Sequence, residues 1–206
     1  RELVVVDDAS TDGTRELLQS QPPGSFRLLL HPVNQGKSKA VRTGIAQAEG
    51  DLLVIQDADL EYDPGQYALL LAPVIEGRAD VVYGSRFHPD GGPGGEAGAL
   101  HVFGNRLLTG LCNLFSGLAL TDMETCYKLF RTEVIRGIPL RAERFGFEPE
   151  VTIKLARQGR WRIVEVPIAY RPRSFAQGKK IRLKDAFHAL AVMVQARFFQ
   201  PAELEP

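Results

Sequence analysis

Short apolar runs alternate with longer helical patterns along the first half of the chain. The runs fall at Leu3–Val6, Phe26–Leu30, Leu52–Gln56 and Asp80–Tyr83. Val4, Val5 and Val6 leave no polar face, which is typical of a strand covered on both sides. Strands separated by helices imply crossover connections, so the pattern predicts an α/β fold with a mostly parallel sheet.

Apolar residues recur at helical spacing between and after these runs. We expect Ser10 to cap a first helix that continues through Leu18. Further helices are predicted at Lys39–Ala48, Tyr67–Ile75, Leu107–Phe115, Pro149–Gln158 and an amphipathic Leu183–Phe199, with a strand at Arg162–Tyr170.

Composition narrows the class of protein. The 206 residues are 44% apolar and 24% charged, as in a globular domain, and 25 basic residues balance 25 acidic ones. A net charge of zero supplies no overall field toward nucleic acid, and we expect no such partner. Cys112 and Cys126 are too few for a disulfide framework. Because the chain enters a strand directly after Arg1 without an initiator Met, we expect a fragment lacking an N-terminal piece.

Charged residues follow three of the predicted strands. Asp7 and Asp8 follow the first, Asp57 and Asp59 the third, and Arg86 the fourth. Ligands of open parallel sheets bind beyond the carboxyl ends of the strands. Carboxylates crowded at that edge repel one another, so a divalent cation is expected there.

Asp57-Ala58-Asp59 is the sharpest of these patterns. Two carboxylates one residue apart at a turn can face one ion, and oxygen ligands favour Mg²⁺ or Mn²⁺. An isolated pattern of this kind is also compatible with a solvated turn that caps a helix. The buried strand before it and the second acidic strand end favour the metal site.

Two further loops have a structural and a functional interpretation. Residues 7–14 can cap the helix that follows them, or accept hydrogen bonds from a nucleotide base or ribose. Residues 34–39 open the next helix with Lys37 and Lys39, a pattern that attracts anions but also fits a plain capped loop.

Together these segments resemble the family-2 glycosyltransferases. The resemblance rests on Asp7-Asp8-x-Ser-x-Asp-Gly-Thr, Asn34-x-Gly-Lys, Asp57-Ala-Asp-Leu-Glu-Tyr-Asp-Pro and Gly84-Ser-Arg-Phe. Two later segments are similar to the dolichol- or polyprenyl-phosphate sugar synthase branch, namely residues 120–131 and Val166-Pro-Ile-x-Tyr with the basic stretch after it. The match covers nearly the whole chain in order.

The resemblance implies a GT-A fold and a metal-dependent transfer that inverts the anomeric configuration. Residues 1–206 would form one domain, with a nucleotide-sugar half at 1–100 and an acceptor half at 101–206. The donor would be a nucleotide-diphosphate sugar of the GDP-mannose or UDP-glucose type, and the acceptor a polyprenyl or dolichyl phosphate. The cofactor would be Mg²⁺ or Mn²⁺.

Site residues carried over from the family are expectations of the same kind. The implied metal ligands are Asp57, Asp59 and Glu61, and the implied donor-binding residues are Asp7, Asp8, Gly36, Lys37, Asp57, Ala58 and Arg86. The implied catalytic residues are Asp59, Lys128 and Asp122, the last as base or as orienting carboxylate. The implied acceptor-binding residues are Arg106, Arg171, Arg173, Lys179 and Lys180.

The chain departs from the family pattern at two places. It lacks the first apolar strand with its Pro-x-Tyr-Asn-Glu type of segment, and Ser38 stands where the family usually has Gly. Two alternatives therefore stay open. One is a transferase acting on a polysaccharide, glycolipid or protein acceptor, and the other is a non-catalytic fragment that binds sugar nucleotides.

A local excess of positive charge bears on membrane contact. Six basic residues and no acidic one lie between Arg171 and Lys184, directly before the amphipathic helix. This pattern suits an anionic membrane surface, although the helix face can equally pack on the domain. We expect a cytoplasmic protein, peripheral at the cytoplasmic face of the membrane. The Gly-rich residues 91–98 are either a lid over the donor or an inert loop.

Overall fold

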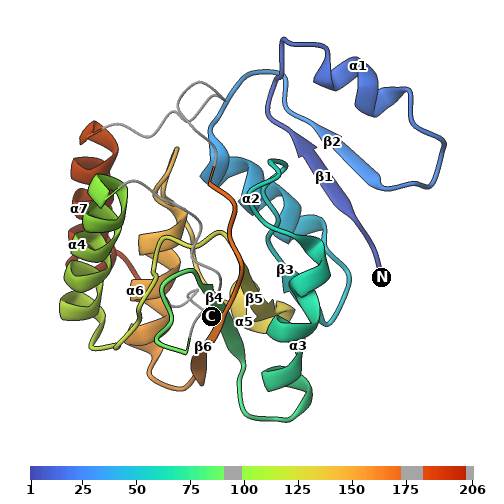
Figure 1. Cartoon of the computed structure of the whole chain (residues 1–206). Coiled ribbons are helices and arrows are strands. Elements are labelled where there is room, and N and C mark those ends of the chain that lie inside the picture. Colours follow the sequence, from blue (N-terminus) through green and yellow to red (C-terminus); the bar gives the residue numbers. More distant parts are fainter. Residues whose placement is uncertain (91–98, 173–182, 203–206) are drawn as a thin grey trace.

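Parallel pairing brings the first two strands together. The computed structural model describes residues 1–90, 99–172 and 183–202, and in it β1 (Val4–Asp7) pairs with β2 (Arg27–Leu30). Helix α1 (Thr14–Gln19) connects them, and α2 (Lys37–Gln47) packs against β1. The crossover expected from the sequence pattern is therefore present (Figure 1).

A second sheet has the strand order β3-β5-β4-β6. Its strands are β3 (Leu52–Val54), β4 (Val81–Ser85), β5 (Lys128–Arg131) and β6 (Ile163–Pro167). β4 and β6 are parallel, whereas β5 runs antiparallel to both of its neighbours. The mixed α/β class with parallel elements is confirmed, and β5 is a strand that the sequence pattern did not predict.

Helices cover this sheet on both sides (Figure 1). The remaining elements are η1 (Pro64–Gln66), α3 (Tyr67–Ile75), α4 (Ala99–Ser116), α5 (Thr132–Arg136), α6 (Phe147–Gln158) and α7 (Leu183–Phe198). α4, α6 and α7 pack against one another, and α3 packs against β4 and β6. Within the described part of the chain, none of these helices combines the length and hydrophobicity needed to cross a bilayer.

The predicted cap of the first helix is wrong. α1 begins at Thr14, and Gly13 stands at the cap position with φ 87° and no side-chain cap. The Ser10 amide instead donates to Asp7 Oδ1 at 3.2 Å, because the chain turns directly after β1. The helix at Tyr67–Ile75 has the predicted bounds, and α2 begins two residues earlier than predicted, at Lys37.

The core is centred on β4, whose residues are all buried. Tyr83 is fully buried, and its hydroxyl lies 2.9 Å from Thr152 Oγ1 of α6. Leu70 and Val74 of α3 are also buried in this core. Because β4 is packed on both faces, its position is rigid, and it in turn positions the residues that follow it.

Asp80 joins three strands at the opposite end of β4 from the predicted site. Its carboxylate accepts hydrogen bonds from Arg162 Nε at 2.9 Å, Arg162 Nη2 at 2.8 Å and Arg131 Nε at 3.3 Å. Asp80 is 9% exposed, and the hydrogen bonds from Arg162, which outweigh burial, lower its pKa to about 2.

We expect Asp80→Asn to destabilise the fold by about 2 kcal/mol near neutral pH. The reason is that Arg162 and Arg131 would then donate to a neutral amide in place of a carboxylate. A depressed carboxyl pKa stabilises the fold above the unfolded value and loses that effect as pH falls toward about 2. The free energies of unfolding of the two proteins, measured in urea, should therefore approach one another as the pH falls. Glu76→Gln, which alters an exposed pair with Arg78, serves as the control; equal losses in both variants would contradict the assignment.

Candidate active site

The turns after β3 and β4 meet the segment that enters β5. The Ile55 amide donates to the Lys128 carbonyl at 3.2 Å, and the Gly84 amide donates to the Tyr127 carbonyl at 2.8 Å. Because β5 is antiparallel to β3 and β4, its entry lies at their carboxyl ends. The antiparallel strand thereby brings residues 121–127 to the edge that carries Asp57 and Arg86.

Lys37 carries a partly buried positive charge at this edge. Its Nζ lies 2.9 Å from Asp57 Oδ2 and 2.9 Å from Glu148 Oε1 of α6. Burial alone would lower the pKa of Lys37, but the carboxylates, Glu148 foremost, outweigh it and hold the pKa well above its usual value. The sequence analysis missed Glu148, which lies one residue before the predicted helix Pro149–Gln158 and belongs to α6 in the structure.

Asp57 and Asp59 occupy one turn after β3. Burial acts to raise the pKa of Asp57, yet the charge and hydrogen bond of Lys37 lower it overall. Asp59 Oδ1 accepts a hydrogen bond from the Glu61 amide at 3.2 Å, and Ala58 between the two aspartates is exposed. Glu61 Oε2 accepts a hydrogen bond from Tyr170 Oη at 3.0 Å, so it lies toward Tyr170.

The carboxylates of this turn suit one kind of metal site. In the described parts of the chain, no three Asp, Glu, His or Cys side chains are grouped to hold a metal ion. Mg²⁺ and related ions commonly take only one or two protein carboxylates, with substrate phosphates and water completing the shell. Asp57 and Asp59 fit that requirement, and they do not form an all-protein cage.

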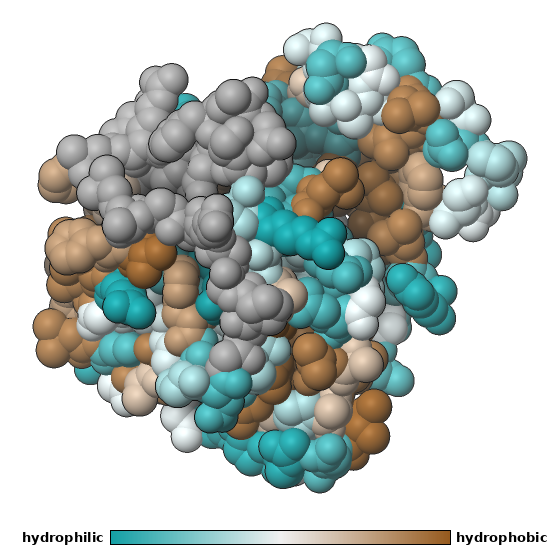
Figure 2. All heavy atoms as spheres, viewed as in Figure 1, coloured by the Kyte–Doolittle hydropathy of each residue, from teal (hydrophilic) through white to brown (hydrophobic). Residues whose placement is uncertain are grey.

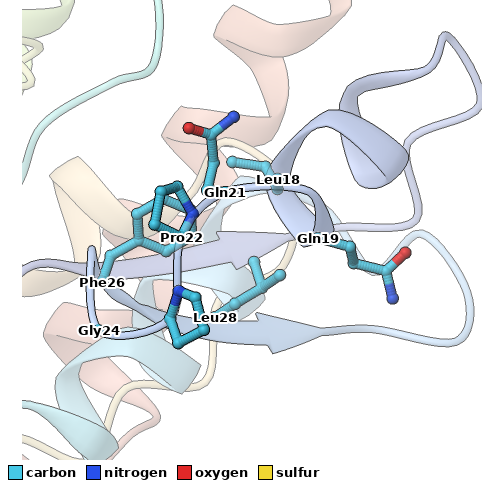
Figure 3. Close-up of a pocket in the computed structure, with 8 residues that line it drawn as sticks. Leu18, Gln19, Gln21, Pro22, Gly24, Phe26 and Leu28 are labelled. Atoms are coloured by element: carbon cyan, nitrogen blue, oxygen red, sulfur yellow. The ribbon is translucent and has the colours of Figure 1, made fainter.

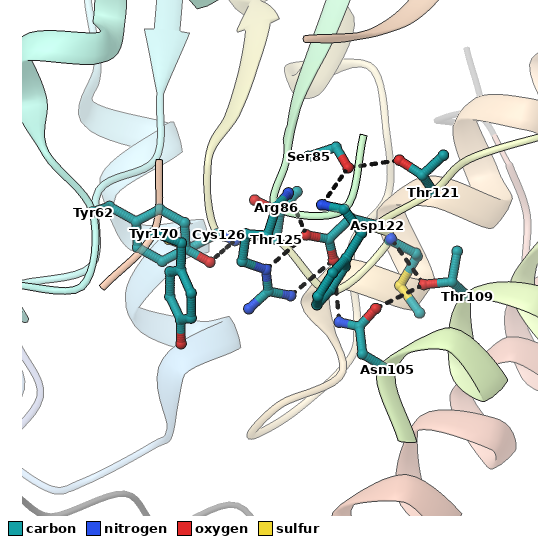
Figure 4. A network of polar contacts seen from close by, with 12 residues as sticks. Tyr62, Ser85, Arg86, Asn105, Thr109, Thr121, Asp122, Thr125, Cys126 and Tyr170 are labelled. Carbon is teal, nitrogen blue, oxygen red and sulfur yellow. Dashed lines mark hydrogen bonds and ion pairs between the residues drawn. The ribbon is translucent and has the colours of Figure 1, made fainter. Parts of the chain in front are cut away.

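Asp122 and Arg86 form a buried ion pair (Figure 4). Arg86 Nε and Nη2 lie 2.6 and 2.8 Å from the two oxygens of Asp122. The Arg86 amide at 3.0 Å and Asn105 Nδ2 at 3.1 Å add two further donors. Asp122 is fully buried, and four donors hold its orientation.

Two groups support the turn that carries Asp122. Glu165 of β6 accepts from the Thr121 amide at 2.7 Å and the Asp122 amide at 3.0 Å. Lys128 is fully buried, and its Nζ donates to the carbonyls of Met123, at 2.7 Å, and Thr125. Burial lowers the pKa of Lys128. Lys128 thus holds the turn from inside the protein, and Glu165 is a second residue that sequence reasoning missed.

Asp7 and Asp8 form local networks beside α2. Asp7 is buried and pairs with Arg15 Nη2 at 2.7 Å. Asp8 accepts from the Gly36 amide at 2.7 Å and lies 2.6 Å from His31 Nδ1. Gly36 has φ 86°, and a Cβ there would lie 2.9 Å from the Arg144 backbone, so only glycine fits. Asp8 consequently fixes the loop from which Lys37 extends.

Two of the predicted acceptor-binding arginines fall on the described surface. Arg106 is exposed on α4 and lines a hollow of about 320 Å³. The other residues around that hollow are Phe87, Thr109, Gly110, Asn113, Leu120 and Thr121. Arg171 is exposed, and its amide donates to the Glu61 carbonyl at 3.0 Å. Arg173, Lys179 and Lys180 lie outside the described residues, as do residues 91–98.

Another hollow, of about 340 Å³, lies beside α1 and β2 (Figure 3). Its described lining residues carry no charge, and they are Leu18, Gln19, Gln21, Pro22, Pro23, Gly24, Phe26 and Leu28. A surface of this kind offers no group that could stabilise a phosphate or a metal ion, so the charged edge described above is the candidate site.

Glu124 lies between the two charged clusters. Its Oε1 is buried without a hydrogen-bond partner among the described residues. Burial is the main cause that raises the pKa of Glu124 to about 7, Glu148 and Asp122 add to it, and Lys128 and Arg86 oppose it. A buried carboxylate oxygen without a hydrogen-bond partner costs free energy, and structures retain one chiefly where it has a function.

We expect Glu124→Gln to become stabilising, relative to the unaltered protein, as pH rises from about 4.5 to about 7. A raised carboxyl pKa means that the folded state binds its proton more tightly, so the unaltered protein loses stability across that interval. The glutamine cannot ionise and avoids this loss. Urea unfolding at the two ends of the interval measures the effect; a difference that is constant with pH would contradict it.

Comparisons of structure identify the fold. The structure of glucosyl-3-phosphoglycerate synthase from Mycobacterium tuberculosis, in complex with Mn²⁺, UDP-glucose and phosphoglyceric acid, superposes with a TM-score of 0.68. It is 20% identical, and the match covers 95% of this chain and 68% of that one. At this identity the likeness shows the fold alone, and the fold is the GT-A type of glycosyltransferases.

Comparisons of sequence identify the family. Residues 1–138 match the Glycosyl transferase family 2 domain, and the chain belongs to that family of glycosyltransferases. An undecaprenyl-phosphate mannosyltransferase of Micrococcus luteus is 32% identical over 86% of this chain and 75% of its own length. A dolichyl-phosphate beta-glucosyltransferase of Trichomonas vaginalis is 28% identical over 82% of this chain, which spans only 52% of that relative.

Proposed function

We propose that this chain transfers a sugar from a nucleotide-diphosphate sugar to a polyprenyl phosphate, with inversion at the anomeric carbon. The observation that carries the proposal is the ion pair between Asp57, which shares its turn with Asp59, and the partly buried cation Lys37, at the same strand edge as the Arg86–Asp122 ion pair. The names of the two curated relatives support the acceptor class.

The donor side would be organised by the turn after β3. Asp57 and Asp59 would hold a divalent cation, which when bound neutralises charge on the departing diphosphate. Lys37 adds a fixed positive charge beside Asp57. Preorganised charges of this kind stabilise the leaving group because they do not have to reorient as charge develops.

The acceptor side would lie around Asp122 and Arg106. An oxygen of the acceptor phosphate attacks the anomeric carbon as the bond to the diphosphate breaks. A phosphate oxygen is already nucleophilic near neutral pH, so no strong base is required. Both oxygens of Asp122 accept from Arg86, which favours the orienting interpretation of this carboxylate over the base. Arg106 and Arg171, with the predicted Arg173, Lys179 and Lys180, would attract the phosphate.

We expect Asp59→Asn and Asp57→Asn each to lower transfer at least about 100-fold, because a well-placed electrostatic group is worth about 3 kcal/mol in the transition state. Release of the nucleoside diphosphate is measured with GDP-mannose and UDP-glucose, with and without Mn²⁺. Undecaprenyl phosphate and 3-phosphoglycerate serve as alternative acceptors. Glu76→Gln, on the exposed end of α3, is the control. Wild-type rates in the Asp59 variant would refute the metal assignment.

A surface on α4 and α7 suits contact with a membrane. Large apolar side chains are 53–78% exposed there. Brown, apolar atoms are visible at the left of Figure 2, where Figure 1 has α4 and α7. This α4–α7 apolar surface consists of Phe103, Leu107, Leu114, Phe187, Phe198 and Phe199. Exposed apolar surface next to a basic stretch is typical of proteins that bind anionic bilayers. Peripheral binding at the cytoplasmic face would bring the site to its lipid acceptor.

We expect Phe187→Asp to weaken binding to anionic vesicles severalfold, because a charge cannot enter the acyl region without a desolvation cost. Co-sedimentation with vesicles containing an anionic phospholipid measures this. Leu17→Asp is the matched control, since Leu17 is 63% exposed on α1, outside the α4–α7 apolar surface. No sedimentation of the unaltered protein, or equal losses in both variants, would contradict peripheral binding.

A further inference from the structure

Glu148 is a buried carboxylate near the start of α6 that no sequence motif identified. It is 5% exposed, and its Oε1 lies 2.9 Å from Lys37 Nζ. The same ammonium lies 2.9 Å from Asp57 Oδ2. Lys37 therefore connects Asp57, of the proposed metal site, to Glu148 of α6.

Without Glu148, Lys37 and a divalent cation would compete for the carboxylate of Asp57. Lys37 is partly buried, and a carboxylate partner offsets the free energy that its ammonium loses on leaving water. With Asp57 as its only carboxylate partner, Lys37 would compete with a divalent cation for the same group. With Glu148 present, Lys37 keeps a partner even when Asp57 turns toward a cation.

Glu150, two residues further along α6, forms an ion pair that serves the structure alone and so provides a comparison for Glu148. Glu150 Oε1 pairs with Lys154 Nζ at 2.6 Å, four residues along α6. Glu150 also accepts from the Arg141 and Ala142 amides. These partners lie on α6 and the loop before it, whereas Glu148 binds a lysine of α2 that contacts Asp57.

We propose that Glu148 is a positioning residue of the donor site, which holds Lys37 so that Asp57 remains available to a divalent cation. This inference rests on the proposed function. Its role is exerted through Lys37, and it requires no contact between Glu148 and the substrate.

The test is a titration of the purified protein with Mn²⁺ alone, with free Mn²⁺ measured by electron paramagnetic resonance. We expect Glu148→Gln to weaken Mn²⁺ binding about tenfold, because Lys37 then pairs only with Asp57. Removing the competing ammonium in the double variant Glu148→Gln/Lys37→Met should restore Mn²⁺ affinity to the wild-type value or better. Glu150→Gln, which loses a buried ion pair on the same helix, should leave Mn²⁺ affinity unchanged.

Urea unfolding of every variant separates positioning from a general loss of folding. Folded Glu148→Gln protein with wild-type Mn²⁺ affinity would overturn the proposal, as would a folded double variant that binds Mn²⁺ as weakly as the single one. In either case sugar transfer by the unaltered protein would leave the proposed function standing. Unaltered protein that transfers sugar but binds no Mn²⁺ would overturn the positioning role alone. Failure of both Mn²⁺ binding and transfer would remove the proposed function as well.

Discussion

The arrangement of the site depends on ion pairs between charged side chains that folding removes wholly or partly from water. At one edge of the four-stranded sheet, the partly buried Lys37 and the buried Arg86 both pair with carboxylates. Each is held by carboxylates from distant parts of the chain: Asp57 and Glu148 bind the first, and Asp122 binds the second. Because an unpaired buried charge costs several kcal/mol, these pairs fix the relative positions of the turns that carry them.

The antiparallel strand β5 connects the two clusters. Residues 121–127 lead into it, so the chain passes from Asp122 at the Arg86 cluster to Cys126, whose Sγ lies 3.8 Å from the Ile55 carbonyl. Glu124 lies midway, and its raised pKa reflects burial together with the carboxylates of both clusters. The Lys37 and Arg86–Asp122 clusters are therefore coupled electrostatically through one short segment.

Much of the fold could be predicted from local patterns, and the exceptions have physical causes. Tyr67–Ile75 has helical periodicity and became α3 with the same bounds. β5 was missed because Lys128-Leu-Phe-Arg is short and flanked by charges, so only pairing with β3 and β4 makes it a strand. Glu148 and Glu165 were missed since their partners, Lys37 and the Thr121–Asp122 amides, lie far away in sequence.

The sequence by itself determined the α/β class, the family resemblance and the carboxylates after β3, because these depend on periodicity and on residue types at short spacing. Tertiary structure alone decided how those groups are used. It pairs Lys37 with Asp57 and Glu148, surrounds Asp122 with donors, and leaves Glu124 Oε1 without a partner among the described residues. The pKa of a charged group and the energy of its ion pairs depend on burial and on partners brought together by folding, and no local pattern contains that information.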